Sequence, residues 1–162
     1  MPSVLFVCTA NMCRSPMAMV LFRRRLGQAG MAAGWRVESA GTWAREGDPA
    51  ARGSQHAMNE QGLDLREHSS RCVTGELLRP FGLILTMSKS HQEALQIEFR
   101  DVADRVYMLT KMAGIAYDVP DPIGGPLKGF IESARELDSL LARGFDQIVR
   151  LATEHEALGA RD

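Results

Sequence analysis

Four short apolar runs predict strands, and they lie at residues 3–7, 35–40, 83–87 and 105–109. The first run is apolar almost without interruption, which is typical of a strand that is buried on both faces. Residues 35–40 instead alternate between polar and apolar positions, as in a strand with one buried face.

Segments with helical periodicity separate these runs. Residues 16–26 carry apolar side chains on one face, and Pro16 suits a first helical turn. The pair Asp48-Pro49 is predicted to open a second helix that runs to about Gln61, with Gly62 as its stop.

The second half of the chain continues the alternation. Residues 88–99 start with serines suited to capping a helix, and residues 128–155 form a long final helix. An alternation of strands and helices favours an α/β fold of three layers, in which helices cover both faces of a parallel sheet. In such sheets the ligand site lies beyond the carboxyl ends of the strands.

The composition describes an ordinary globular chain. Its 162 residues are 45% hydrophobic and 24% charged, which predicts a single domain over residues 1–162. The net charge of −1 gives no electrostatic reason to expect nucleic acid or a membrane as a partner. We find no apolar stretch of membrane-spanning length and no signal peptide, so we expect a cytoplasmic protein.

Cysteine usage indicates free thiols. Cys8, Cys13 and Cys72 make an odd number with no disulfide pattern, and the histidines show no metal-ligand spacing. We therefore expect reduced thiols, no metal site and no cofactor.

The stretch "VLFVCTANMCRSP" places chemistry at the end of the first strand. If Cys8 ends the strand and a helix begins near Ser15, residues 9–14 form a tight loop at a helix N-terminus. Such a loop attracts phosphate through unpaired N–H groups and the helix dipole, and Arg14 adds a fork of donors matched to two phosphate oxygens. The same positive field favours a thiolate, so Cys8 is predicted to be a nucleophile.

A thiolate at this place could displace an alcohol from a phosphate monoester and form a thiophosphate that water then hydrolyses. One carboxylic acid on a facing loop could protonate the leaving oxygen and later activate the water. A Ser15 hydroxyl would help the sulfur to leave, and no metal is needed. The spacing Cys-x5-Arg alone is a weak signal, and the structural alternative is a buried cysteine beside an arginine that covers the helix.

"VLFVCTANMCRSP" resembles the signature of the low-molecular-weight protein tyrosine phosphatase family, and "DVPDPIGG" resembles its general-acid loop. "VESAGT" and "REHSSR" also occur in the family's order. The resemblance implies a four-stranded parallel sheet flanked by helices and phosphorylated protein or peptide as substrate, with inorganic phosphate as product. It implies that the catalytic residues are Cys8, Arg14 and Asp121, and that the phosphate-binding residues are Thr9, Ala10, Asn11, Met12, Cys13, Arg14 and Ser15.

The resemblance also gives supporting roles. Asn11, Ser39 and His68 match positions that brace the phosphate loop through hydrogen bonds. Cys13 is either a loop-filling thiol or, as in some relatives, a partner that traps oxidised Cys8 as a disulfide. Cys72 is expected to be a packing residue. By itself, Asp121 before a proline could equally be a turn residue.

Substrate preference depends on the pocket residues Met12, Trp43 and Ile123. Tyrosine-specific relatives usually carry an aromatic residue where this chain has Ile123, and Trp43 or Tyr117 could supply the aromatic contact instead. Protein-arginine phosphatases of the same family share "VCT" and "DP-x-GG". The resemblance gives threonine for them at the position of Met12 and isoleucine for tyrosine-type members, so the large apolar Met12 favours the tyrosine type.

Two further functions compete with this interpretation. Arsenate reductases share the fold and the anion loop, but they need extra cysteines that "LILTMSKS" lacks. A phosphate-binding module without turnover would be plausible if Cys8, Arg14 or Asp121 had been replaced, and all three are present.

Overall fold

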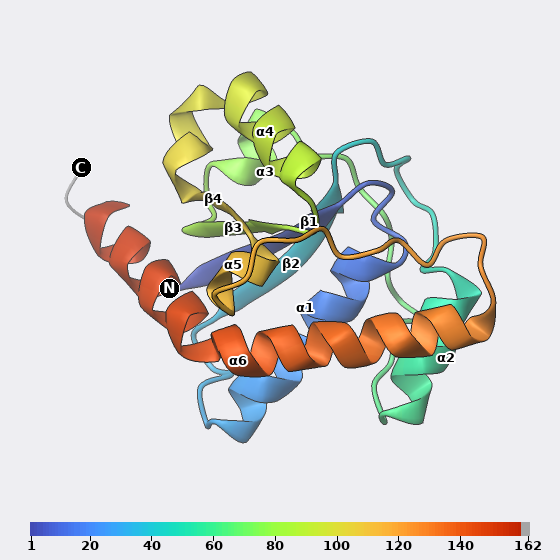
Figure 1. Ribbon diagram of the computed structural model, residues 1–162. Helices are drawn as coiled ribbons and strands as arrows, with labels where there is room; N and C mark the ends of the chain where they lie inside the picture. The colour runs from blue at the N-terminus through green and yellow to red at the C-terminus, as the bar shows by residue number, and fades with distance from the viewer. Residues whose placement is uncertain (160–162) are drawn as a thin grey trace.

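The computed structural model describes residues 1–159 (Figure 1). Its strands are β1 (Ser3–Cys8), β2 (Arg36–Gly41), β3 (Leu83–Thr86) and β4 (Val106–Met108). Its helices are α1 (Arg14–Gln28), α2 (Arg52–Glu60), α3 (Gly75–Leu78), α4 (Lys89–Glu98), the 3-10 helix η1 (Arg100–Arg105), α5 (Leu109–Met112) and α6 (Leu127–Gly159).

The four strands form one parallel sheet in the order β2-β1-β3-β4. Side chains alternate along β1, so Val4 and Phe6 pack in a core with α1 and α6, while Leu5 and Val7 pack in a second core with α3, α4 and η1. Figure 1 shows α1, α2 and α6 on one side of the sheet and α3 and α4 on the other. This arrangement confirms the predicted three-layer α/β fold.

The predicted strands agree with the structure to within one residue at each end. Strands buried on both faces give an unbroken apolar signal, which makes their ends easy to locate. The long final helix is also confirmed, and its predicted apolar face is buried against the sheet and α1. In the described part of the chain, no helix is long and apolar enough to cross a membrane.

The prediction for the second helix was wrong at its start. Asp48-Pro49 does not open α2, which begins at Arg52. Asp48 instead pairs with Ser70, because its N–H donates to Ser70 Oγ and its carbonyl accepts the Ser70 N–H. The Ala51 N–H donates to Met12 O. These tertiary hydrogen bonds hold the segment in an extended path up to Ala51.

Three short elements were not predicted, namely α3, η1 and α5. Each is too short for helical periodicity to show in the sequence. The first helix also starts two residues before Pro16, so Arg14 is its first residue rather than the last residue of the loop.

Candidate active site

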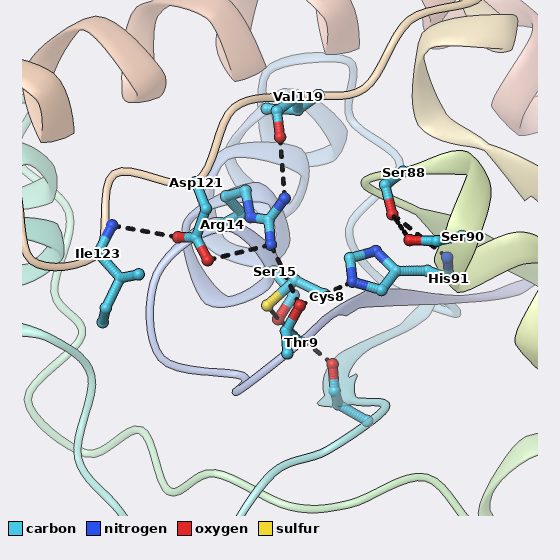
Figure 2. Close-up of polar contacts among 11 residues, drawn as sticks. Cys8, Thr9, Arg14, Ser15, Ser88, Ser90, His91, Val119, Asp121 and Ile123 are labelled. Carbon is cyan, nitrogen blue, oxygen red and sulfur yellow. Dashed lines mark hydrogen bonds and ion pairs between the residues drawn. The ribbon is translucent and has the colours of Figure 1, made fainter.

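Cys8 is the last residue of β1, and residues 9–13 connect it to the N-terminus of α1 at the carboxyl edge of the sheet. The thiol is buried, and its Sγ lies 2.9 Å from Ser15 Oγ in the first turn of α1 (Figure 2). That first turn contains no acidic residue, so the positive end of the helix is not neutralised locally. An anion bound in the loop would therefore meet both the helix dipole and the thiol.

Asn11 braces the loop from inside. It is fully buried and its φ is 58°, in the left-handed region that asparagine tolerates better than most residues. Its Nδ2 donates to Ser15 Oγ at 2.8 Å and to Ser39 Oγ at 3.0 Å. His68 Nε2 lies 2.7 Å from Asn11 O, and Asn11 Oδ1 accepts the Arg71 N–H. The structure thus places Ser39 and His68 against the loop; sequence reasoning missed Arg71, whose contribution is a backbone N–H.

Two residues directly after β2 also form backbone hydrogen bonds with Cys8 and with the loop. Thr42 N–H donates to Cys8 O and Trp43 N–H donates to Thr9 O, at 2.9 and 3.0 Å. Gly41 makes this approach possible, because a Cβ at its position would lie 2.3 Å from Thr9 O. The loop is thus held by backbone N–H groups directly after β2 as well as by side chains.

Arg14 reaches across the loop with its guanidinium almost fully buried, at 6% side-chain exposure. Its Nη1 donates to Val119 O at 2.8 Å, and its Nη2 lies 3.3 Å from Asp121 Oδ2 and 3.5 Å from Thr9 Oγ1 (Figure 2). Nε is buried and has no hydrogen-bond partner among residues 1–159. Nε and Nη2 form a planar edge that matches two phosphate oxygens once Nη2 gives up its contact with Asp121.

Asp121 lies on the segment between α5 and α6, which crosses the carboxyl edge of the sheet (Figure 1). The segment is anchored to the start of α4, since Val119 N–H donates to Met87 O and Lys89 N–H donates to Asp118 Oδ1. Asp121 is 37% exposed at its side chain, and its Oδ1 accepts the Ile123 N–H. The carboxylate thus faces both the arginine and solvent, where a leaving group would depart.

Sequence reasoning missed His91, which lies in the first turn of α4. Its Nε2 is 2.8 Å from Thr9 Oγ1 (Figure 2). Burial is the main cause that lowers the pKa of His91 to about 4, and Arg14 lowers it further. No motif marks this histidine, because only the packing of α4 against β3 and β4 brings it to the loop.

The three cysteines are free thiols in different surroundings. Cys13 is buried, and burial together with Asp121 and Cys8 raises its pKa to about 12. Cys72 is partly exposed, and its N–H donates to Glu46. The described residues contain no group of three His, Cys, Asp or Glu side chains that could hold a metal ion.

Two exposed apolar residues are joined to the site through their backbones. Trp43 is 86% exposed and Ile123 is 50% exposed, and the backbone N–H of each is bonded to a site residue, Thr9 and Asp121 respectively. The Tyr117 hydroxyl donates to Glu136 at 2.7 Å, and Glu136 lines the same surface hollow as Asp121 and Ile123. Burial raises the pKa of Tyr117 to about 12. Met12 is partly buried against the core.

Comparison with known proteins gives a consistent result. The family described as "Low molecular weight phosphotyrosine protein phosphatase" matches residues 3–155. A protein-arginine-phosphatase of Bacillus subtilis (strain 168) is 34% identical over 139 residues, covering 85% of this chain and 91% of the relative. The low molecular weight protein tyrosine phosphatase from T. tengcongensis superposes with a TM-score of 0.84 at 34% identity, covering 90% of this chain and 98% of that one.

A second solved structure is the YwlE arginine phosphatase, in a cysteine-to-serine mutant whose active-site serine is phosphorylated. It superposes with a TM-score of 0.86 at 32% identity and covers 92% of this chain and 99% of that one. Similarity at this level extends over nearly the whole fold.

Proposed function

Because the chain belongs to the low molecular weight phosphotyrosine protein phosphatase family, we propose that it hydrolyses phosphotyrosine in protein or peptide substrates through a cysteinyl-phosphate intermediate. The observation that carries the proposal is the grouping of Cys8 Sγ, the guanidinium of Arg14 and Asp121 around one loop at a helix N-terminus, with Arg14 Nε unpaired and Arg14 Nη2 in contact with Asp121.

In the first step Cys8 Sγ attacks phosphorus in line with the leaving oxygen, and the sulfur–phosphorus bond forms as the oxygen–phosphorus bond breaks. Arg14 and the N–H groups at the start of α1 stabilise the charge on the phosphoryl oxygens. Asp121 gives its proton to the leaving oxygen. The charge is thus balanced by the protein, and the proposed route draws on no metal ion.

In the second step Asp121, now a carboxylate, takes a proton from water, and the water oxygen attacks phosphorus. The sulfur leaves as a thiolate, which the Ser15 hydroxyl at 2.9 Å stabilises by donating a hydrogen bond. Inorganic phosphate is the product. The phosphorylated active-site serine of the YwlE mutant supports a covalent phosphoenzyme in this fold.

Substrate preference is the first prediction. We expect a higher kcat/KM for phosphotyrosine peptides than for phosphoarginine peptides, because Met12 is large and apolar and the exposed Trp43 is bonded to the loop through its backbone N–H, so that its ring is available to a substrate ring. The measurement compares kcat/KM for two peptides of otherwise identical sequence, one with phosphotyrosine and one with phosphoarginine. The same comparison is made with the Met12→Thr variant, in which the preference for phosphotyrosine should weaken. A preference of the unaltered chain for phosphoarginine would favour the arginine type, which the Bacillus relative also supports.

The role of Asp121 is tested by leaving-group dependence. Asp121→Asn keeps the size of the side chain but removes the proton, so kcat should fall by roughly two orders of magnitude for phenyl phosphate. The loss should be smaller for p-nitrophenyl phosphate, whose leaving oxygen needs less protonation. Asp118→Asn is the control. Asp118 Oδ1 accepts the Lys89 N–H, and an asparagine oxygen can accept the same bond, so kcat should change little. Equal losses for both substrates would exclude Asp121 as the acid.

Redox sensitivity is a third prediction. Peroxide should convert the Cys8 thiolate to a sulfenic acid, and Cys13 should then displace water to form a disulfide that dithiothreitol reverses. Because the pKa of Cys13 is raised to about 12, disulfide formation should be slow at neutral pH and faster at high pH. Peptide mapping of oxidised protein measures the bond, and Cys13→Ser should lose reversibility. A map without a Cys8–Cys13 peptide would remove this role.

A further inference from the structure

His91 belongs to a chain of polar contacts that ends on the catalytic arginine proposed above. His91 is 7% exposed, and its Nε2 lies 2.8 Å from Thr9 Oγ1. The same Oγ1 lies 3.5 Å from Nη2 of Arg14, the nitrogen that also contacts Asp121 (Figure 2). The three residues come from α4, the loop after β1 and α1, so the chain joins three separate elements.

The ring is held on a rigid support. Ser88 caps α4, since its Oγ accepts the His91 N–H, and Ser90 Oγ lies 3.0 Å from Ser88 Oγ. The residue before the cap, Met87, donates its N–H to Val7 O in β1. The position of His91 relative to the loop after β1 is therefore set by backbone hydrogen bonds, and little conformational entropy remains to be lost when the ring orients Thr9.

The surroundings of the ring indicate its protonation. Nδ1 is buried and has no hydrogen-bond partner in the described part of the chain. Orphaned buried N–H donors are rarer than orphaned acceptors, so we assign the proton of the neutral ring to Nε2, which then donates to Thr9 Oγ1. The pKa of about 4 keeps the ring neutral at physiological pH, because burial and Arg14 outweigh the opposing effect of Asp118 and Asp121.

We propose that His91 is a positioning residue for the phosphoryl-transfer reaction, which holds Thr9 Oγ1 against Nη2 of Arg14 and so fixes the plane of the guanidinium. The inference rests on the proposed phosphatase function. In this arrangement Thr9 Oγ1 accepts hydrogen bonds from both His91 and Arg14, and its own proton is left for a third acceptor such as a phosphate oxygen.

The need for such a contact follows from what happens to Arg14 during the reaction. Val119 O anchors Nη1, but a single hydrogen bond lets the guanidinium pivot about it. Asp121 contacts Nη2 in this structure, yet the proposed mechanism requires that carboxyl group at the leaving oxygen. Thr9 is then the remaining protein contact on Nη2 among the described residues, and its orientation depends on His91. Misalignment of a catalytic group by about 1 Å can cost on the order of a hundredfold in rate.

The experiment compares His91→Leu, His91→Asn and His91→Gln with p-nitrophenyl phosphate as substrate. Glutamine can place an amide N–H near the position of Nε2, whereas asparagine is too short and leucine has no donor. We expect kcat to fall roughly tenfold or more in the leucine and asparagine variants with little change in KM, and the glutamine variant to recover most of it. His56→Leu, on the exposed face of α2, is the matched control and should keep wild-type kinetics.

A double-mutant cycle separates positioning from general damage. Thr9→Val removes the acceptor, so adding His91→Leu to it should cost almost nothing more, whereas independent effects would multiply. The proposal would be overturned if the losses of kcat in Thr9→Val and His91→Leu multiplied in the double variant. It would also be overturned if His91→Leu kept the wild-type kcat and melting temperature. A lower kcat that glutamine fails to rescue would do the same.

A spectroscopic measurement on the unaltered protein keeps the test independent of folding of the variants and of turnover. Nitrogen-15 NMR of the histidine rings should show His91 as the Nε2–H tautomer, protonating with a midpoint near pH 4. Thr9→Val should shift its Nε2 resonance. An Nδ1–H tautomer, or a midpoint near 6.5, would contradict the inference. If instead the wild-type protein turned over no aryl phosphate, the proposed function would fail while these NMR results still decided the His91–Thr9 contact.

Discussion

Replacing Cys8 with serine is expected to lower kcat for an aryl phosphate by roughly four orders of magnitude or more while phosphate still binds. A serine hydroxyl at this position is a far weaker nucleophile than a thiolate. Binding should persist, because the loop N–H groups and the guanidinium of Arg14 are untouched. Steady-state kinetics measure the loss, and isothermal titration with inorganic phosphate or vanadate measures the binding.

The matched control is Cys72→Ser, the same chemical change on a partly exposed thiol outside the proposed machinery. Its kcat should remain near that of the unaltered chain. Appreciable turnover in Cys8→Ser, or a similar loss in both variants, would contradict the proposed nucleophile.

The second large effect is expected at Arg14. Arg14→Lys keeps the positive charge but removes the planar edge formed by Nε and Nη2, so a lysine can meet one phosphate oxygen where arginine meets two. The lost donors act most strongly as charge moves onto the transferring phosphoryl group. We expect kcat/KM to fall by roughly three orders of magnitude, measured with p-nitrophenyl phosphate.

Arg150→Lys, on the exposed side of α6, serves as the control for the same substitution and should change neither kcat nor KM. Melting temperatures of both variants should be measured as well, because Arg14 also joins α1 to Val119 in the segment between α5 and α6 that carries Asp121. A kcat/KM for Arg14→Lys within about tenfold of the unaltered value would show that charge alone is sufficient, and it would remove the bidentate role.

The two predictions concern residues that the sequence already singled out, while the contacts that position those residues were harder to foresee. Cys8 and Arg14 stand in one continuous stretch, so their relation follows from one strand ending and one helix starting. Asp121 lies 107 positions beyond Arg14, and the resemblance to a family loop, rather than any local pattern, identified it. His91 had no such signal, because a single histidine leaves no motif. Arg71 lies within "REHSSR", but its bond to the loop is made by a backbone N–H, which no residue type marks.

The limits of local reasoning also appear in the fold. The start of α2 was misplaced because Asp48-Pro49 is a common opening for a helix, whereas here the backbone of Asp48 is paired with Ser70. Capping preferences describe isolated helix ends, and a long-range pair of hydrogen bonds can outweigh them. At Ser88 the predicted serine cap of α4 is present, because its Oγ accepts the His91 N–H.

By itself, the sequence determined the alternation of strands and helices, the parallel sheet and the loop between Cys8 and Arg14, because hydrophobic periodicity and the chemistry of a helix N-terminus act between near neighbours. The family resemblance named Asp121, Ser39 and His68, but only the tertiary structure brought them to the loop and added His91. Asp121, His91 and the Asn11 partners Ser39 and His68 come together through strand order and helix packing. Those contacts depend on the summed burial of the whole chain, which no short stretch of residues encodes.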